Sequence, residues 1–182
     1  MSLVLDGSLG VTFPASNTPS FTNYQGGAIA SGTAVASTSG TSITFSSIPS
    51  WVKRITVMFS GVSTTGTSNI QVQLGTSGGI VTTGYASQAS SGSTATASTT
   101  GLLSQYSNAA AATWYGLQVI TLLGSNIYTS AGNLSRSDVA GTITNQFNSG
   151  GVTLSSALTQ IAITTVGGTD TFDAGSINIL YE

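Results

Sequence analysis

Two aspartates close together, Asp170 and Asp173, are the arrangement in this sequence that comes nearest to a carboxylate site. A calcium loop recruits more oxygen ligands at defined steps and has a glycine at its bend. A hydrolytic carboxylate pair needs a cleft in which one carboxyl stays protonated. Neither pattern is visible around these residues. We therefore interpret them as turn residues whose side chains accept hydrogen bonds from nearby backbone N–H groups.

The residue types that carry most enzyme chemistry are missing. The chain has no His and no Cys, which excludes an imidazole base, a thiolate nucleophile and the histidine or thiolate ligands of common metal sites. Only three Lys and Arg residues are present, too few to line a phosphate-binding groove, so nucleic-acid binding is excluded. We predict a non-enzymatic binding or structural protein with no metal and no cofactor.

The adjacent cations Lys53 and Arg54 form the one basic pair in the sequence. On a strand their side chains project to opposite faces, so they cannot act as one basic patch. We expect one of them to make a salt bridge or to hydrogen-bond a carbonyl group.

Aromatic side chains provide a further chemistry, because an uncharged protein holds sugars by stacking them on aromatic rings. Tyr106 and Tyr115, in the stretch around Trp114, are the candidates for glycan stacking, next to Asn, Gln and Ser groups that could hydrogen-bond hydroxyls. The same residues are equally typical of the core and rim of any β-protein.

The elements that must position these residues are strands. Ser and Thr make up 59 of 182 residues and charged residues 4%, where a typical domain has roughly 25%. The hydrophobic fraction of 40% and the low net charge are unlike those of disordered chains. With few charges to protect strand edges, we expect the chain to cover them by oligomerisation.

Period-2 alternation begins at residue 41. Ile55, Val57 and Phe59 point one way, and Ile70, Val72 and Leu74 are expected inward with Gln71 and Gln73 outward. Residues 86–101 are low-complexity Ser, Thr and Ala and are expected to form a long loop or an irregular edge. Further strands are expected over Gly141–Phe147, Leu158–Val166 and Gly175–Tyr181.

The segment from Trp114 to Leu123 is apolar on both faces, unlike a strand with one solvated side. It is either at the centre of a sandwich or buried in a subunit interface. The candidate interface residues are Trp114, Leu117, Val119, Ile120 and Leu122.

These patterns predict an all-β, antiparallel β-sandwich of jelly-roll type over residues 41–182. Residues 1–40 are expected to form an extended N-terminal arm. Its apolar residues would attach it to a partner; they are Leu3, Val4, Leu5, Val11 and Phe13. No stretch approaches the roughly 20 apolar residues of a membrane helix, so we expect no membrane insertion.

Three stretches resemble a family of bacteriophage fibre and virion-surface proteins with a C-terminal β-sandwich. The first is IPSWVKRITVMFSGVS from Ile48, followed by IQVQLG from Ile70. The second is the ending, TTVGGTDTFDAGSINILYE from Thr164. The third is LDGSLGVTFP from Leu5, which is similar to short leaders of the same class.

The resemblance implies a homotrimeric, non-enzymatic virion component that is assembled in the host cytoplasm. Only about 40 residues precede the expected sandwich, fewer than the adaptor and shaft of a tail fibre require. That length favours a capsid decoration (cement) protein whose arm contacts the major capsid protein. The alternative is a short tail fibre or receptor-binding tip, a tail component that recognises a host surface glycan.

Overall fold

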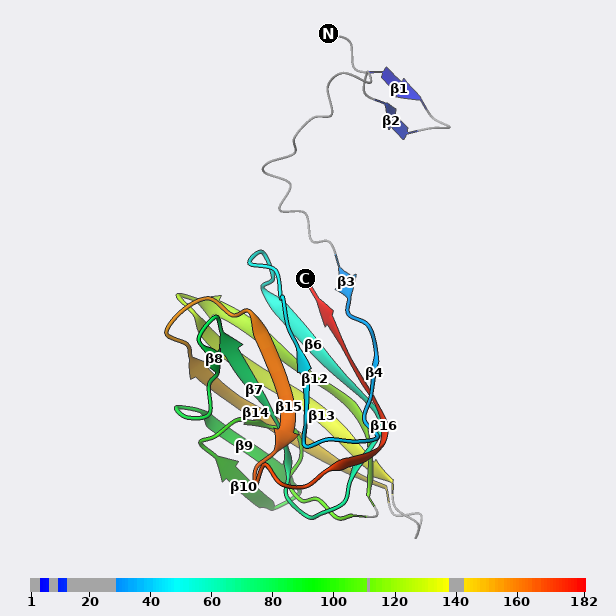
Figure 1. Cartoon of the computed structure of the whole chain (residues 1–182), viewed down its shortest axis with the longest axis vertical. Helices are drawn as coiled ribbons and strands as arrows, with labels where there is room; N and C mark the ends of the chain where they lie inside the picture. The colour runs from blue at the N-terminus through cyan, green and yellow to red at the C-terminus, as the bar shows by residue number, and fades with distance from the viewer. Residues whose placement is uncertain (1–3, 7–9, 13–28, 111, 138–142) are drawn as a thin grey trace.

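The computed structural model describes residues 4–6, 10–12, 29–110, 112–137 and 143–182. Within these ranges the elements are strands, every pairing is antiparallel, and no helix is present (Figure 1). The prediction of an all-β chain of antiparallel strands is therefore confirmed. Two sheets face each other, and their buried residues form one hydrophobic core.

The large sheet has nine strands among the described residues, in the order β10-β9-β14-β13-β12-β6-β16-β3, with β4 also paired to β16. Its strands are β3 (Ala30–Ser31), β4 (Val35–Ala36), β6 (Arg54–Thr64), β9 (Ala86–Ser91), β10 (Thr94–Ser98), β12 (Thr113–Gly124), β13 (Ile127–Ser137), β14 (Ile143–Thr153) and β16 (Phe172–Tyr181).

The small sheet has the order β11-β7-β15-β5, with β8 also paired to β7. Its strands are β5 (Ser42–Phe45), β7 (Ile70–Thr76), β8 (Gly79–Ile80), β11 (Leu102–Leu103) and β15 (Gln160–Thr165). A separate hairpin joins β1 (Val4–Asp6) and β2 (Gly10–Thr12).

The chain crosses repeatedly between the two layers, and its pairings are nested. β4 pairs with β16, β5 with β15, β6 with β12, and β7 with β11. The outermost strands in sequence thus pair with each other, and so do the innermost. This nesting brings the N-terminal and C-terminal segments of the folded region side by side on one edge of the large sheet (Figure 1).

Alternation along the strands builds the core. Ile55, Val57 and Phe59 of β6 are buried, as are Ile70, Val72 and Leu74 of β7, and all six belong to the same hydrophobic core. These inward positions agree with the sequence prediction. Gln71 and Gln73, expected outward and wet, are also buried, because residues 98–101 cover them: Gln73 Nε2 donates to the Thr100 carbonyl at 2.8 Å.

The end of the predicted arm belongs to the folded region. The Gly32 amide donates to the Ile179 carbonyl at 2.8 Å, and the Ser37 amide donates to the Gly175 carbonyl at 2.9 Å. The Ser37 hydroxyl is buried and donates to the Ala174 carbonyl at 2.7 Å. The predicted boundary at residue 40 therefore cuts through hydrogen-bonded structure, and residues from β3 onward form the short edge strands that cover β16.

The low-complexity segment 86–101 is not a long loop. It forms the β9–β10 hairpin at the other edge of the large sheet, where β9 also pairs with β14. Small side chains give little periodic signal, yet backbone groups pair regardless of side-chain size, and Gly92 (φ +61°) supplies the turn. The alternative expectation, an edge of the sheet, describes its position better.

Under β12, β13 and β14 the interior contains hydrogen-bonded polar side chains beside apolar ones. Gln118 is buried; its Oε1 accepts from the Ser104 hydroxyl at 2.8 Å and its Nε2 donates to Ser130 Oγ at 2.9 Å. Asn148 Nδ2 donates to the Ser104 carbonyl at 2.9 Å. Hydrogen bonds between buried polar groups offset the free-energy cost of removing these groups from water. A chain so rich in Ser, Thr, Asn and Gln can therefore form a packed domain.

One buried tyrosine ties the small sheet to the loop after β8. The Tyr85 hydroxyl accepts from the Leu74 amide at 2.7 Å and donates to the Val81 carbonyl at 2.9 Å. Burial raises the pKa of Tyr85 to about 12 from 10.0, against a smaller opposite effect of the Leu74 hydrogen bond. Because the folded state holds this proton more tightly than the unfolded state, stability falls as the pH rises from 10 to 12.

We expect Tyr85→Phe to lower the free energy of unfolding at pH 8 by about 1 kcal/mol, since hydrogen bonds are lost. The variant should also show a smaller decrease in stability between pH 10 and 12, because the titrating group is gone. Urea unfolding at several pH values measures both effects. An unchanged pH slope would contradict the assignment of this titration to Tyr85.

Candidate functional site

The predicted interface strand β12 has two faces with different surroundings. Trp114 and Ile120 are 0% and 1% exposed and lie in the core, and Leu122 packs against it. Leu117 is 46% exposed and Val119 half-buried, both on the opposite face. Trp114 and Ile120 are thus core residues of the chain itself, and the surface part of the predicted set is reduced to Leu117 and Val119.

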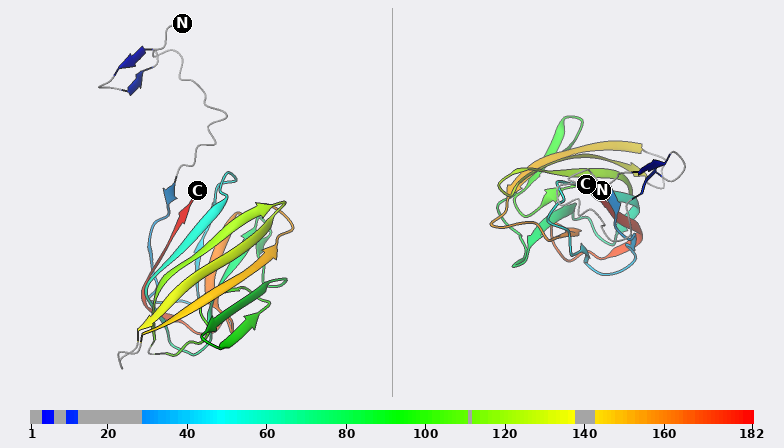
Figure 2. Two further views of the ribbon diagram at one scale, coloured as in Figure 1. Left: turned by 180° about the vertical axis from the view of Figure 1, so that it is seen from behind. Right: turned by 90° about the horizontal axis from the view of Figure 1, so that it is seen from above.

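Apolar side chains gather on the solvent side of the three long strands β12–β14. Among the described residues, nine large hydrophobic side chains are exposed, and five of them belong to these strands: Tyr115, Leu117, Leu123, Ile127 and Phe147. Figure 2 shows these strands side by side in the view from behind. Exposed apolar groups that concentrate on one surface mark interaction sites more often than scattered ones do.

Register places several of these side chains in rows across the sheet. One row runs Phe147, Asn133, Leu117, Met58, Asn178 from β14 to β16. The next parallel row runs Ser149, Ala131, Val119, Thr56, Leu180. We call the outward side chains of these two rows, together with Tyr115, the outer face.

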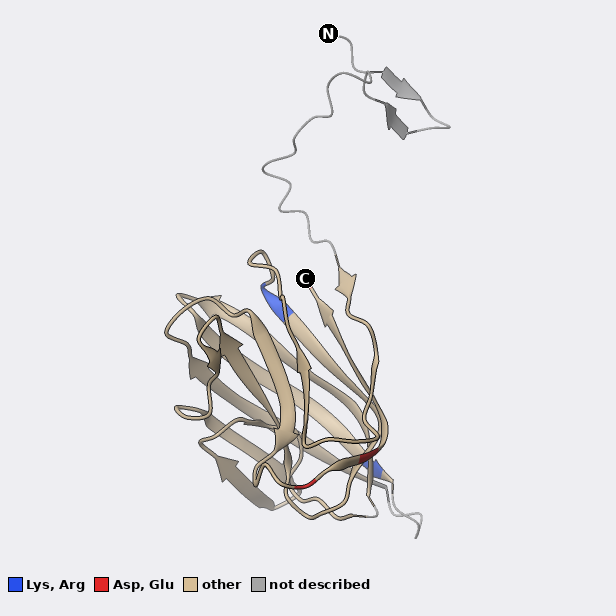
Figure 3. Cartoon of the chain, viewed as in Figure 1, with Lys and Arg blue, Asp and Glu red and all other residues tan. Residues whose placement is uncertain are grey.

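The outer face carries no ionic group, since none of its residues is Lys, Arg, Asp or Glu. Figure 3 shows the charged residues toward the two ends of the domain, with basic residues at the start of β6 at one end and acidic residues on β16 and the loop before it toward the other. Arg54 forms an ion pair with Glu182, which confirms the expectation that one of the two adjacent cations makes a salt bridge. A neutral, partly apolar, amide-bearing surface suits association with another protein surface.

Tyr115 lies at the border of the outer face beside a bulge. β6 has one extra residue opposite Trp114 and Gly116, and Gly61 sits in this bulge with φ +65°. A Cβ on Gly61 would lie 3.2 Å from the Tyr115 hydroxyl, so the tyrosine ring covers this glycine closely. The ring is 48% exposed and remains available for stacking.

Tyr106, the other predicted stacking residue, is half-buried. Its amide donates to Gln146 Oε1 at 2.5 Å and its carbonyl accepts from Asn69 Nδ2 at 2.8 Å. These contacts fix its backbone among the loops at the end of the domain away from Tyr181. Of the two predicted glycan-stacking residues, Tyr115 alone offers a largely exposed ring.

Asn108 organises the same end of the domain, and sequence reasoning missed it. Its Nδ2 donates to Thr64 Oγ1 at 2.7 Å and to the Ser68 carbonyl at 3.0 Å. Its Oδ1 accepts from Trp114 Nε1 at 2.9 Å. The side-chain amide of Asn108 therefore connects two chain segments to the buried indole of Trp114. An Asn six residues before a Trp is not a recognisable sequence motif, so the sequence did not indicate this role.

Asp170 acts in the same loops. Its carboxylate accepts from the Ser68 amide at 2.8 Å, across 102 positions of sequence. It therefore accepts a backbone hydrogen bond, as expected, but from a distant loop and not from its own turn. The described residues contain no cluster of three or more acidic, His or Cys residues placed to bind a metal ion.

Part of the predicted attachment segment falls in the β1–β2 hairpin. Val4 and Leu5 belong to β1 and Val11 to β2, with Leu5 opposite Val11. Leu3 and Phe13 lie outside the described residues.

Comparison with known proteins gives no family. No family model, no curated protein and no solved structure matches the chain. In the part of the chain that the structure describes, no helix is long and apolar enough to cross a bilayer.

Proposed function

We propose that this chain is a non-enzymatic structural protein of a bacteriophage virion, a homotrimeric capsid decoration (cement) protein assembled in the host cytoplasm. The observation that carries the proposal is the uncharged, partly apolar outer face, which a solitary chain leaves in water. The lack of His and Cys in the sequence points the same way, because the common nucleophilic and metal-assisted mechanisms depend on them.

The proposal includes a jelly-roll sandwich, and the nested pairing supports it. A jelly roll arises when a long antiparallel hairpin is wrapped so that its strands alternate between two sheets. The pairs β4·β16, β5·β15, β6·β12 and β7·β11 follow that order. In this scheme β13 and β14, which follow β12, and the β9–β10 hairpin widen the layer to which the outer face belongs.

The proposal also includes an N-terminal arm that attaches to neighbouring capsid subunits. In this proposal the segment that precedes β3, which begins at Ala30, reaches a neighbouring subunit. Val4, Leu5 and Val11 supply apolar side chains for such a contact. The resemblance of Leu5–Pro14 to short leaders of phage proteins supports the same assignment.

Deleting residues 1–14 tests the attachment. We expect the truncated protein to remain a soluble trimer and to lose its association with virions, because the contacting segment is gone. The measurement is co-sedimentation with virions of the phage that encodes the protein, together with analytical ultracentrifugation of the free protein. Truncated protein that still decorates particles would contradict the arm.

Point substitutions test whether the apolar side chains of this segment, and not merely its presence, are needed for attachment. Leu5→Asp with Val11→Asp removes two apolar groups and should abolish co-sedimentation. Ser2→Asp with Ser8→Asp is the matched control, because it adds the same two charges to the same segment without removing an apolar side chain. An equal loss of co-sedimentation in the test variant and in the control would show that the added charge, and not the loss of apolar contact, prevents attachment.

A receptor-binding tip is the second candidate, and the exposed ring of Tyr115 is the observation that favours it. Adsorption of the purified protein to host cells separates the two functions. Strong, host-specific adsorption together with no binding to the capsid would favour the tip.

A further inference from the structure

The end of the domain near Tyr181 contains a pocket that neither the outer face nor the proposed arm uses. Its volume is about 140 Å³, and it lies between the loop 48–53, the β12–β13 turn and the loop before β15. Its lining combines apolar groups, among them Val52, Leu122 and Leu158, with the polar residues Ser50, Lys53 and Asn126. One water molecule needs roughly 10–15 Å³ by the same measure, so the pocket has room for a group the size of a sugar ring.

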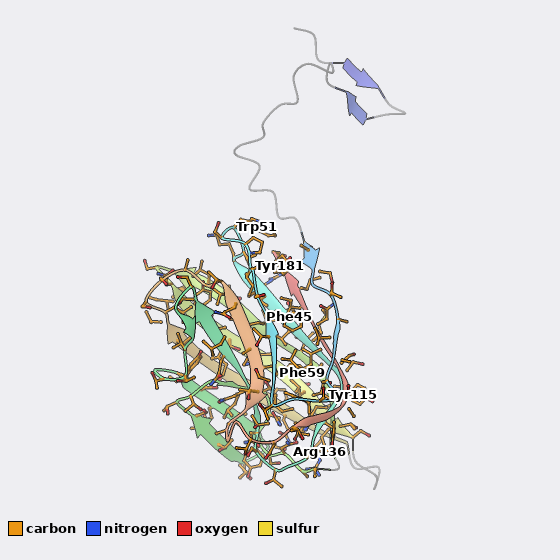
Figure 4. The ribbon with its side chains drawn as sticks, in the orientation of Figure 1. Phe45, Trp51, Phe59, Tyr115, Arg136 and Tyr181 are labelled. Carbon is orange, nitrogen blue, oxygen red and sulfur yellow. The ribbon has the colours of Figure 1, made fainter. Side chains whose placement is uncertain are left out.

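An exposed indole stands beside this pocket. Trp51, between the lining residues Ser50 and Val52, is 46% exposed. Its ring packs on Tyr181 with centroids 5.8 Å apart and planes at 52°. Figure 4 shows the two rings together at this end of the domain, with Tyr115 toward the other end. A supported but exposed tryptophan offers a flat apolar platform with a polar edge.

The loop that carries Trp51 is held in place before any ligand binds. The Ile48 amide donates to the Thr159 carbonyl at 2.9 Å, and the Lys53 amide donates to the Glu182 carbonyl at 2.7 Å. Ser47, just before the loop, has φ +59°, a conformation that a non-glycine residue adopts at a cost and that often accompanies functional sites. A prearranged loop loses little conformational entropy on binding.

Lys53 supplies a charge to the pocket. In the described part of the chain no carboxylate lies within ion-pair distance of its ammonium group, since the ion pair there joins Arg54 to Glu182. The Lys53 side chain therefore has its positive charge available for an anionic group on a ligand. Ser50 and Asn126 offer neutral groups that can hydrogen-bond hydroxyls.

We propose that this pocket, with Trp51 and Lys53, binds an acidic oligosaccharide that contains uronic acid. One sugar ring stacks on the Trp51 indole while its neighbour enters the pocket and places its carboxylate on the Lys53 ammonium. Ser50 and Asn126 bind hydroxyls of the same ring. None of the residues that line the site belongs to the outer face or to the sequence before β3, so the inference does not depend on the proposed function.

Intrinsic fluorescence of the full-length protein tests the site, because the chain has two Trp residues and Trp114 is buried. We expect tetragalacturonate to change the Trp51 emission in a saturable way, and neutral maltotetraose to bind at least about tenfold more weakly. Added salt should weaken the tetragalacturonate complex and leave the neutral one unchanged.

Variants assign the roles. Trp51→Ala should lower the affinity measured by calorimetry at least about tenfold, and Lys53→Gln should reduce the affinity for tetragalacturonate to that for maltotetraose. Val166→Ala, which shortens an exposed apolar side chain outside the pocket, is the control and should bind as the unmodified protein does.

Two results would overturn the proposal. One is the absence of saturable binding of either sugar at millimolar concentration. The other is equal binding of tetragalacturonate by the Lys53→Gln variant and the unmodified protein. Tighter binding of a short acidic peptide than of the tetragalacturonate would likewise reassign the pocket to a protein ligand.

Discussion

Replacing Asn108 with alanine is expected to lower the free energy of unfolding by about 2–4 kcal/mol, since the change leaves buried groups without partners. Trp114 is fully buried, and its Nε1–H donates to Asn108 Oδ1. On the other side of the amide, Thr64 Oγ1 and the Ser68 carbonyl lose their donor. The effect exceeds that of an ordinary surface substitution because one side chain serves three partners on different segments.

Urea unfolding of the full chain measures this loss. Asn145→Ala is a matched control: its side chain is an exposed amide with a hydrogen bond to Ser135, so its removal should change stability by about 0.5 kcal/mol or less. Asn108→Asp keeps an acceptor for the indole but places a carboxylate against two acceptors, and it should also destabilise. Similar values for Asn108→Ala and Asn145→Ala would contradict the central role of Asn108.

The strands that the sequence predicts well are those with large, alternating side chains. Ile43 and Phe45 in β5, and Ile161 and Ile163 in β15, are all buried, as their period-2 spacing predicts. In such strands the apolar residues occur at every second position, and the pleat of the backbone places every second side chain on the same face of the sheet. The hydrophobic pattern therefore predicts which side chains point inward. The fold class therefore follows from a few segments.

Strands with small or polar side chains cannot be predicted from hydrophobic alternation. β13 (Ile127–Ser137) has eleven residues and pairs on both sides, yet no strand was expected there. Its inward side chains include Ser130, which bonds Gln118, next to Tyr128 and Leu134. A hydrophobicity pattern cannot detect a position that is filled by a hydrogen bond, because the polar partner comes from a distant strand.

The outer face could be predicted only in part from the sequence. Two apolar faces on β12 predicted that both faces are covered; the chain's own core covers the face of Trp114 and Ile120, while Leu117 on the other face is exposed. Sequence alone cannot say which of the two faces the core covers. The register with Met58 and Phe147 settles which side chains share the outer face. These partners come from strands far apart in sequence and carry no common motif.

Introducing charge on the outer face is expected to dissociate the proposed trimer. Leu117→Arg and Phe147→Arg replace side chains that are 46% and 60% exposed, so the fold of each chain should be largely unaffected. In a three-fold assembly every substitution occurs three times around one axis, and the added cations repel one another across a surface that has no carboxylate. We expect self-association at least about a hundredfold weaker, or roughly 2.7 kcal/mol.

Sedimentation equilibrium at micromolar concentration measures the change, and urea unfolding of the same samples checks that the variants remain folded. Ser93→Arg, in the exposed β9–β10 turn, adds the same charge away from the outer face and should leave the trimer intact. A trimer that survives both substitutions would place the interface elsewhere. An unmodified protein that sediments as a monomer would remove the homotrimer itself, because the outer face would then be stable in water without a covering copy.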